Sequence, residues 1–168
     1  MVENRFISAL RILNKHAVDY ILVGGVASSV RGAIYNTRDL DVVHSRPPEN
    51  IGRLLVALRE LNARFIFRPE FVPNESRLAS PGQQLLSTDL GRIDVLGRIG
   101  AGWDYGELIG HSSDVELVPG VTARVLDLET IIASKEAVGG EKDLAVLPLL
   151  RRTLQELRRR QAAQLDQL

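Results

Sequence analysis

Hydrophobic residues recur along this chain with two different periods. A spacing of three to four residues places Phe6, Leu10 and Leu13 on one side of a predicted helix over residues 5–15. The same spacing, together with helix-start signals, predicts further helices over residues 49–61, 128–138 and 149–163. Short runs of β-branched and aliphatic residues predict strands over residues 21–23, 38–43, 64–67, 85–87, 92–96, 115–118 and 121–125.

Prolines and glycines mark the connections between these elements. Residues 88–91 and 119–120 carry turn residues between predicted strands, so both predict antiparallel hairpins. Residues 69–82 carry three prolines and predict a long surface loop or lid. The sequence favours neither of two roles for it: a loop without function, or one that contacts a substrate. Pro148 predicts a kink or a new helix start.

Composition narrows the class of protein. The 168 residues are 45% hydrophobic and 25% charged, which is typical of a globular domain with one core. The formal net charge is zero, so the chain as a whole does not attract nucleic acid electrostatically. There is no cysteine, no apolar run near the ~20 residues of a membrane helix and no secretory signal pattern, which fits a cytoplasmic protein that does not enter membranes. Without repeats or linkers, a single domain over residues 1–168 is expected, with a core over 18–126 and C-terminal helices over 127–165.

Residues 20–43 carry the most chemical information. The predicted strand 21–23 ends at Gly24 and Gly25, where the backbone can turn sharply and approach a ligand closely. A short helix is predicted to follow over residues 26–31, with Ser28 and Ser29 near its start. Because a helix N-terminus presents unpaired N–H groups and partial positive charge, this turn suits a phosphate.

The next predicted strand carries two carboxylates. Asp39 and Asp41 are two residues apart, so they share one face of the strand, while Leu40 and Val42 point to the other. Two close carboxylates repel each other unless a cation neutralises them, and Mg²⁺ binds a few carboxylates together with waters and substrate phosphates. The simpler alternative is a solvated strand face with no ligand.

The order of glycine pair, short helix and Asp39-x-Asp41 resembles the nucleotidyltransferases of the DNA polymerase β superfamily. Within it, the chain is most similar to small nucleotidyltransferases related to abortive-infection toxins and antibiotic-modifying enzymes. Gly25 stands where a serine is often found, so hydroxyl contacts to the phosphate would come from Ser28 or Ser29. The resemblance makes Asp94, on the strand 92–96, the third acid, although Asp94 taken alone also fits a surface residue offset by Arg92 or Arg98.

A C-terminal pattern extends the resemblance to about residue 150. A helix-borne lysine, Lys135, and the pair Lys142-Asp143 match residues that close one side of the nucleotide site in these enzymes. The implied fold is an α+β two-layer nucleotidyltransferase fold with a mixed, mainly antiparallel twisted sheet and helices on one face. The implied cofactor is Mg²⁺ or Mn²⁺ held by Asp39, Asp41 and Asp94, and the implied substrate is a nucleoside triphosphate such as ATP, with Arg38 as a further cation for its phosphates.

The acceptor of the implied transfer stays open at this point. An RNA or tRNA end or a protein, as in toxin–antitoxin systems, is one hypothesis, and antibiotic adenylylation is the nearest alternative. A non-catalytic nucleotide- or partner-binding module is the alternative from another class, and a homodimer or partner protein could complete the cleft. A dinucleotide-binding oxidoreductase is disfavoured because Val26 and Ser29 interrupt the glycine spacing that it needs. The histidines His16, His44 and His111 have no ligand spacing, and the arginines near the C-terminus predict a solvated helix face or, as a minority view, an RNA or partner surface.

Overall fold

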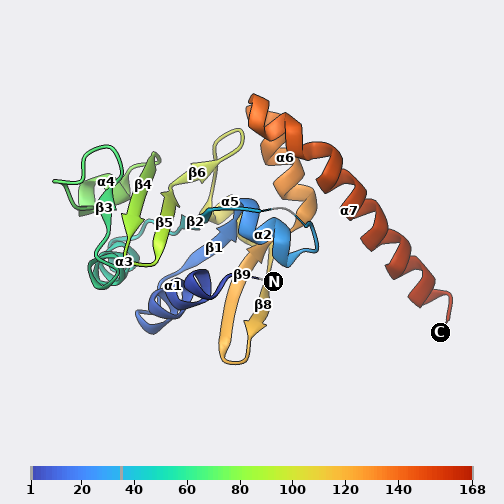
Figure 1. Ribbon diagram of the computed structural model, residues 1–168, viewed down its shortest axis with the longest axis horizontal. Coiled ribbons are helices and arrows are strands. Elements are labelled where there is room, and N and C mark those ends of the chain that lie inside the picture. The colour runs from blue at the N-terminus through green and yellow to red at the C-terminus, as the bar shows by residue number, and fades with distance from the viewer. Residues whose placement is uncertain (1, 35, 168) are drawn as a thin grey trace.

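A computed structural model describes residues 2–34 and 36–167 of the chain (Figure 1). One twisted sheet of seven strands runs through the molecule in the order β3-β4-β5-β2-β1-β9-β8. Its strands are β1 (Tyr20–Val23), β2 (Asp39–His44), β3 (Arg64–Phe65), β4 (Gln83–Thr88), β5 (Gly91–Leu96), β8 (Ser112–Val118) and β9 (Val121–Leu126). A separate ribbon pairs β6 (Arg98–Ile99) with β7 (Trp103–Asp104).

The sheet is mixed rather than mainly antiparallel. The predicted hairpins β4–β5 and β8–β9 are antiparallel, and so are the pairs β1–β2 and β3–β4. At the centre, however, β2 lies parallel to β5 and β1 lies parallel to β9. These two parallel pairs join strands that are far apart in sequence, and turn residues report only on strands that follow each other. The two central strands β1 and β2 therefore each have one antiparallel and one parallel neighbour.

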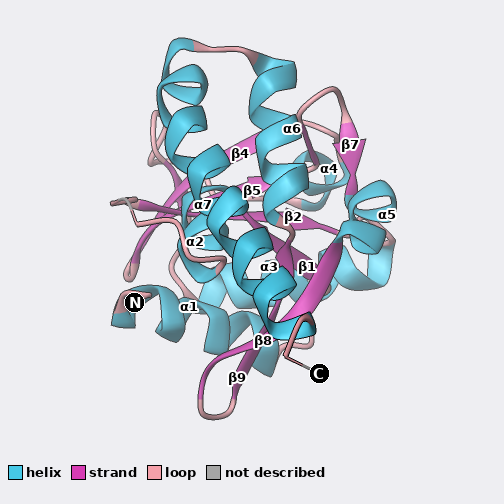
Figure 2. Ribbon diagram, turned by 90° about the vertical axis from the view of Figure 1, so that its right-hand side faces the viewer, coloured by secondary structure: helices cyan, strands magenta, loops and turns pink. Residues whose placement is uncertain are grey.

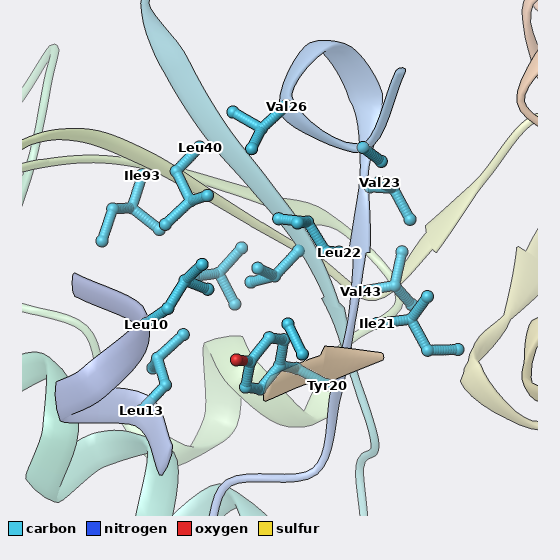
Figure 3. Packing of buried hydrophobic residues seen from close by; sticks show 14 of the residues in the cluster. Leu10, Leu13, Tyr20, Ile21, Leu22, Val23, Val26, Leu40, Val43 and Ile93 are labelled. Atoms are coloured by element: carbon cyan, nitrogen blue, oxygen red, sulfur yellow. The ribbon is translucent and has the colours of Figure 1, made fainter. Parts of the chain in front are cut away.

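The main helical layer covers one face of the sheet. It consists of α1 (Asn4–Lys15), α3 (Pro48–Glu60) and α4 (Glu75–Ala79). Leu10 and Leu13 of α1 lie beside Tyr20 and Leu22 of β1 in the core (Figure 3). All four residues of β1 are buried, which explains why β1 reads as a continuous apolar run. Each such side chain contributes about 1.5–3 kcal/mol when it leaves water.

The remaining helices connect strands or follow the sheet. They are α2 (Gly24–Val30), α5 (Tyr105–Leu108), a 3₁₀ turn η1 (Ile109–His111), α6 (Leu128–Val138) and α7 (Glu141–Leu165). Figure 2 views the molecule from the side on which α7 lies, with α6 next to it. Asp127 is the N-cap of α6 and accepts a hydrogen bond from the backbone N–H of Thr130. Among the helices of the described residues, none combines the length and the apolar character that a membrane crossing needs.

Three local details differ from the sequence predictions. The segment 69–82 contains the helix α4, which Asn74 caps by accepting a hydrogen bond from the backbone N–H of Arg77. Residues 98–99 and 103–104 form the ribbon β6–β7, for which the sequence analysis predicts no strands. The last helix continues through the exposed Pro148, so this proline does not start a new helix, while the alternative prediction of a kink stays a prediction.

Candidate active site

The three predicted acids lie on adjacent strands and on the same face of the sheet. In the parallel pair β2–β5, Asp39 is opposite Arg92 and Asp41 is opposite Asp94. Alternation along both strands sends these four side chains to the face away from α1. The intervening residue Leu40 is fully buried on the other side, among the core residues. Burial of one face thus fixes the register that brings the carboxylates together.

A guanidinium lies between the acids. Arg92 donates from Nε to Oδ1 of Asp94 at 2.9 Å and from Nη2 to Oδ2 of the same carboxylate at 3.1 Å. Its Nε is also 3.6 Å from Oδ2 of Asp39. This two-bond geometry is the strong form of an arginine–carboxylate pair. Arg92 therefore supplies a positive charge inside the acid cluster, as in the alternative interpretation of Asp94.

The two neighbouring positive charges, Arg92 and Lys135, do not compensate the three carboxylates. Burial, followed by repulsion from Asp94 and Asp39, raises the pKa of Asp41 to about 7, although Lys135 and Arg92 act in the opposite direction. Burial also raises the pKa of Asp94, whose side chain accepts both bonds from Arg92. The cluster thus holds a carboxyl that keeps its proton near neutral pH and that an additional cation would ionise.

The glycine turn lies directly against Asp41. Gly24 has a φ of +65°, and a Cβ at this position would stand 2.3 Å from Oδ2 of Asp41. A side chain at residue 24 would therefore be strained by its backbone conformation and would also displace the carboxylate. The first turn of α2 starts at this glycine, so its backbone N–H groups face the region of the acids.

A cavity of about 250 Å³ opens beside Asp41. Lys135 reaches it from α6 and donates to Oδ1 of Asp143 at 3.2 Å, and the side chain of Lys135 is 18% exposed. The remaining walls are mainly apolar and come from β1, β5, the β6 region and α6: Val23, Leu96, Ile99, Ile131 and Val138. The cavity therefore combines a lysine and carboxylates at one end with an apolar lining.

Other predicted site residues lie elsewhere. Ser28 is buried and donates from its hydroxyl to the carbonyl of Gly24, within α2. Ser29 lines a different and smaller cavity near the N-terminus of the chain. Arg38 and Lys142 are exposed and do not line the cavity beside Asp41.

Two residues of this region carried only weak sequence signals. Arg92 alternates with Asp94 along one strand, which places both on one face but does not show which acids the guanidinium binds. Asp143 belongs to the quoted lysine–aspartate pair, and it is the acid of that pair that reaches the cavity. Gly25, the second predicted glycine, is buried in the first turn of α2.

The donor atoms suit a hard divalent cation. Within residues 2–34 and 36–167, no three histidine, cysteine, aspartate or glutamate side chains are already arranged as a ligand set. In this arrangement Arg92 donates to both oxygens of Asp94, and its Nε lies 3.6 Å from Oδ2 of Asp39. Carboxylate oxygens are the ligands that Mg²⁺ and Mn²⁺ prefer. The guanidinium of Arg92 supplies positive charge at the place where such a cation would bind. The residues present therefore fit a divalent metal that takes over part of the role of Arg92.

Comparison with solved structures places the fold. No family model matches the chain, and no curated protein matches its sequence. The chain is similar to the lincosamide antibiotic adenylyltransferase LnuA in its lincomycin-bound form, with a TM-score of 0.62 and 14% identity over 90% of this chain and 97% of that one. It is also similar to the antibiotic-resistance factor ANT(2'')-Ia, with a TM-score of 0.58 and 15% identity over 99% and 98% of the two chains.

A third similar structure is that of a candidate nucleotidyltransferase from Thermotoga maritima. The TM-score is 0.54 and the identity 18%, over 93% of this chain and 96% of that one. All three similarities extend over nearly the whole of both chains, while the identities are too low to carry more than architecture. The chain therefore has the nucleotidyltransferase fold.

Proposed function

We propose that the protein is a metal-dependent nucleotidyltransferase, which moves a nucleoside monophosphate from a nucleoside triphosphate to a hydroxyl acceptor. The observation that carries this proposal is the meeting of Asp39, Asp41 and Asp94 on one sheet face, beside Gly24 and within reach of the charge of Lys135. These groups come from four separate elements, so a solvated strand face does not explain their convergence.

The three acids would hold the metal, and one of them would also accept a proton. Asp41 and Asp94, with Asp39, would hold one or two Mg²⁺ or Mn²⁺ ions, which supply charge to the phosphates and to the departing pyrophosphate. Both oxygens of Asp94 already accept from Arg92, whereas Asp39 is 34% exposed and only 3.6 Å from that arginine. Asp39 is therefore the better group to accept the proton of the attacking hydroxyl.

The transfer itself conserves every group. The acceptor oxygen forms a bond to the α-phosphorus, the bond from that phosphorus to the bridging β-oxygen breaks, and pyrophosphate leaves with the electron pair. Backbone N–H groups after Gly24 and Gly25 would bind the triphosphate, and Lys135 would neutralise part of its charge. Arg38 and Lys142, both exposed, would contribute only from the rim, and Ser28 and Ser29 would need to reorient to reach the phosphates.

Small-molecule adenylylation is the second candidate function. Two of the similar structures are an antibiotic adenylyltransferase and an antibiotic-resistance factor, and both pair over nearly their full length with this chain. The two candidates share the acids and the triphosphate site and differ only in the acceptor. A toxin-like role would belong to the first candidate, with an RNA or protein acceptor. A module that binds nucleotide without transfer would keep the cavity but show no turnover.

Binding and transfer assays separate these outcomes. Calorimetry with Mn²⁺ and each nucleoside triphosphate would establish the site, and transfer of label from an α-³²P nucleotide to RNA, protein or lincomycin would identify the acceptor. Asp41→Asn should abolish metal-dependent transfer while the fold is retained. Asp114→Asn, which changes an exposed aspartate on β8, is the matched control and should keep full activity. Equal turnover in both variants would refute the assignment.

A further inference from the structure

Two phenylalanine rings stand in solvent after β3. Phe67 is 78% exposed and Phe71 is 50% exposed, and they are the two aromatic residues among the exposed large hydrophobic side chains of the described chain. The neighbouring Val72 is also 52% exposed. Burying such a ring would gain about 1.5–3 kcal/mol, so a cluster that stays in water indicates a binding surface rather than a folding element.

The backbone that carries these rings is tied down. The N–H of Phe65 donates to the carbonyl of Phe71 at 3.2 Å, and the N–H of Phe71 donates to the carbonyl of Arg68 at 2.9 Å. The N–H of Ile66 donates to the carbonyl of Leu85 on β4 at 3.1 Å. Because the turn is already ordered, a ligand on these rings would not have to offset the entropy of ordering a loop.

Arginines accompany the rings. The guanidinium carbon of Arg68 lies 4.8 Å from the centre of the Phe71 ring, and that of Arg77 lies 5.1 Å from the centre of the Phe65 ring. Together with Phe67 these four residues line a cavity of about 260 Å³. We call Phe65, Phe67, Arg68, Phe71 and Arg77 the aromatic–arginine surface. It offers flat apolar faces with two guanidinium groups held over them, of which that of Arg68 also donates from Nε to Oε1 of Glu70 at 2.7 Å.

This surface adjoins the acid cluster. It is built at the β3 edge of the sheet, next to α4 and β4 (Figure 1). Leu85, which lines its cavity, is the strand partner of Asp94 on β5. Gln83 lines both this cavity and the one that contains Asp41 and Lys135. A ligand can therefore extend from the aromatic–arginine surface across Gln83 to the acids.

We propose that the aromatic–arginine surface binds the unpaired 3′ end of a single-stranded RNA and directs its terminal hydroxyl to the acid cluster. This inference rests on the proposed nucleotidyl transfer and names its acceptor. Bases of any sequence stack on aromatic and guanidinium faces, and arginines pair with the phosphates between them. With zero net charge on the chain, such a local surface is the way in which this protein can hold a polynucleotide.

The position of the surface argues against the two nearest alternatives. In the proposed function the incoming nucleotide would have its phosphate groups near Gly24 and Lys135, which line the cavity beside Asp41 together with Gln83. A small acceptor would fill the cavity beside Asp41 and would leave Phe67, with more than three quarters of its surface in solvent, without a role. A polynucleotide end uses both the distant rings and the acid cluster.

Fluorescence anisotropy tests the surface on the full chain. The probe is a labelled, unstructured RNA about 12 nucleotides long, without metal or nucleotide in the buffer. The wild type should bind it in a salt-dependent way, and Phe67→Ala/Phe71→Ala should weaken binding at least about tenfold. Leu165→Ala, which removes a 70% exposed side chain at the end of α7, is the matched control and should bind like the wild type. Both variants should keep the wild-type melting temperature within a few degrees.

Three outcomes separate this inference from the proposed function. If the wild type binds Mn²⁺ and ATP but not the RNA, or if the double phenylalanine variant binds RNA normally, the inference is overturned and the rings are assigned to a protein partner. If RNA binding falls with Arg160→Gln on α7 instead, the surface is misplaced and the inference is likewise overturned. If RNA binds through the rings but Mn²⁺ and ATP do not bind, the proposed transfer fails while the RNA surface stands.

Discussion

Replacing Asp41 by asparagine should make the metal-free protein more stable at alkaline pH. The pKa of Asp41 is raised from its ordinary value of 3.8 to about 7, first by burial and then by Asp94 and Asp39. The folded state therefore binds a proton more tightly than the unfolded chain does. That part of the stability is fully present below pH 3.8 and is lost as the pH rises through about 7. Asparagine resembles the protonated acid and carries no such dependence.

The magnitude follows from the size of the shift. One pKa unit corresponds to about 1.4 kcal/mol, so a shift of this size removes roughly 3 kcal/mol between pH 5 and pH 8. Neighbouring charges share their titration with Asp41, which makes this figure an order of magnitude. For a chain of this length, roughly 3 kcal/mol corresponds to about 6–12 °C in the melting temperature.

The assay is thermal unfolding in EDTA at pH 5 and pH 8, for the wild type and Asp41→Asn. The melting temperature of the variant should exceed that of the wild type slightly at pH 5 and by several degrees more at pH 8, because the wild type loses this stability progressively between its unfolded and folded pKa. Because both proteins share every other titrating group, the difference between their melting temperatures isolates Asp41. One such group is His44: burial lowers its pKa, so its contribution to stability increases as the pH rises. Saturating Mn²⁺ should raise the melting temperature of the wild type at pH 8 but not that of the variant. A difference that is the same at both pH values would refute the reasoning.

Three further changes probe the same region. Gly24→Ala should destabilise the protein by about 1–2 kcal/mol through its positive φ, and further because the added Cβ has no room beside Asp41. Gly120→Ala is the control, because Gly120 also has a positive φ but open space around it. In chemical denaturation it should show only the effect of the backbone conformation. Arg92→Gln should lower the melting temperature in EDTA yet tighten Mn²⁺ binding several-fold in calorimetry, since it removes both the internal countercharge and the competitor for the carboxylates; weaker metal binding would contradict this. His44→Ala should destabilise the protein by about 2–4 kcal/mol, because the variant loses the hydrogen bond from the single N–H of this buried neutral ring to a backbone carbonyl and leaves a cavity.

Local patterns were sufficient for most elements and for the two hairpins, but not for the pairing of strands far apart in sequence. The alternation of Asp39, Leu40 and Asp41 determines which side chains share a face, and the structure keeps that alternation. The parallel pairing of β2 with β5 depends on contacts between segments about 50 residues apart, which no turn residue announces. The position of Asp94 opposite Asp41 was accordingly expected from the resemblance and not from the chain's own periodicity. Which carboxylates Arg92 would bind depends on that same register, so only its face was predictable.

The glycine pair and the two aspartates of β2 form one geometric constraint. The antiparallel register places Val23, the last residue of β1, opposite Asp41, so the chain that leaves β1 must pass directly over this carboxylate. A Cβ on Gly24 would stand 2.3 Å from Oδ2 of Asp41, so only glycine allows β1 to end, α2 to begin and the acid to remain in place. The same close approach brings the first backbone N–H groups of α2 next to the acids. The position of Asp41 thus requires a glycine at residue 24. The sequence carries both residues because they contact each other in the fold, and a substitution at either residue tests that contact.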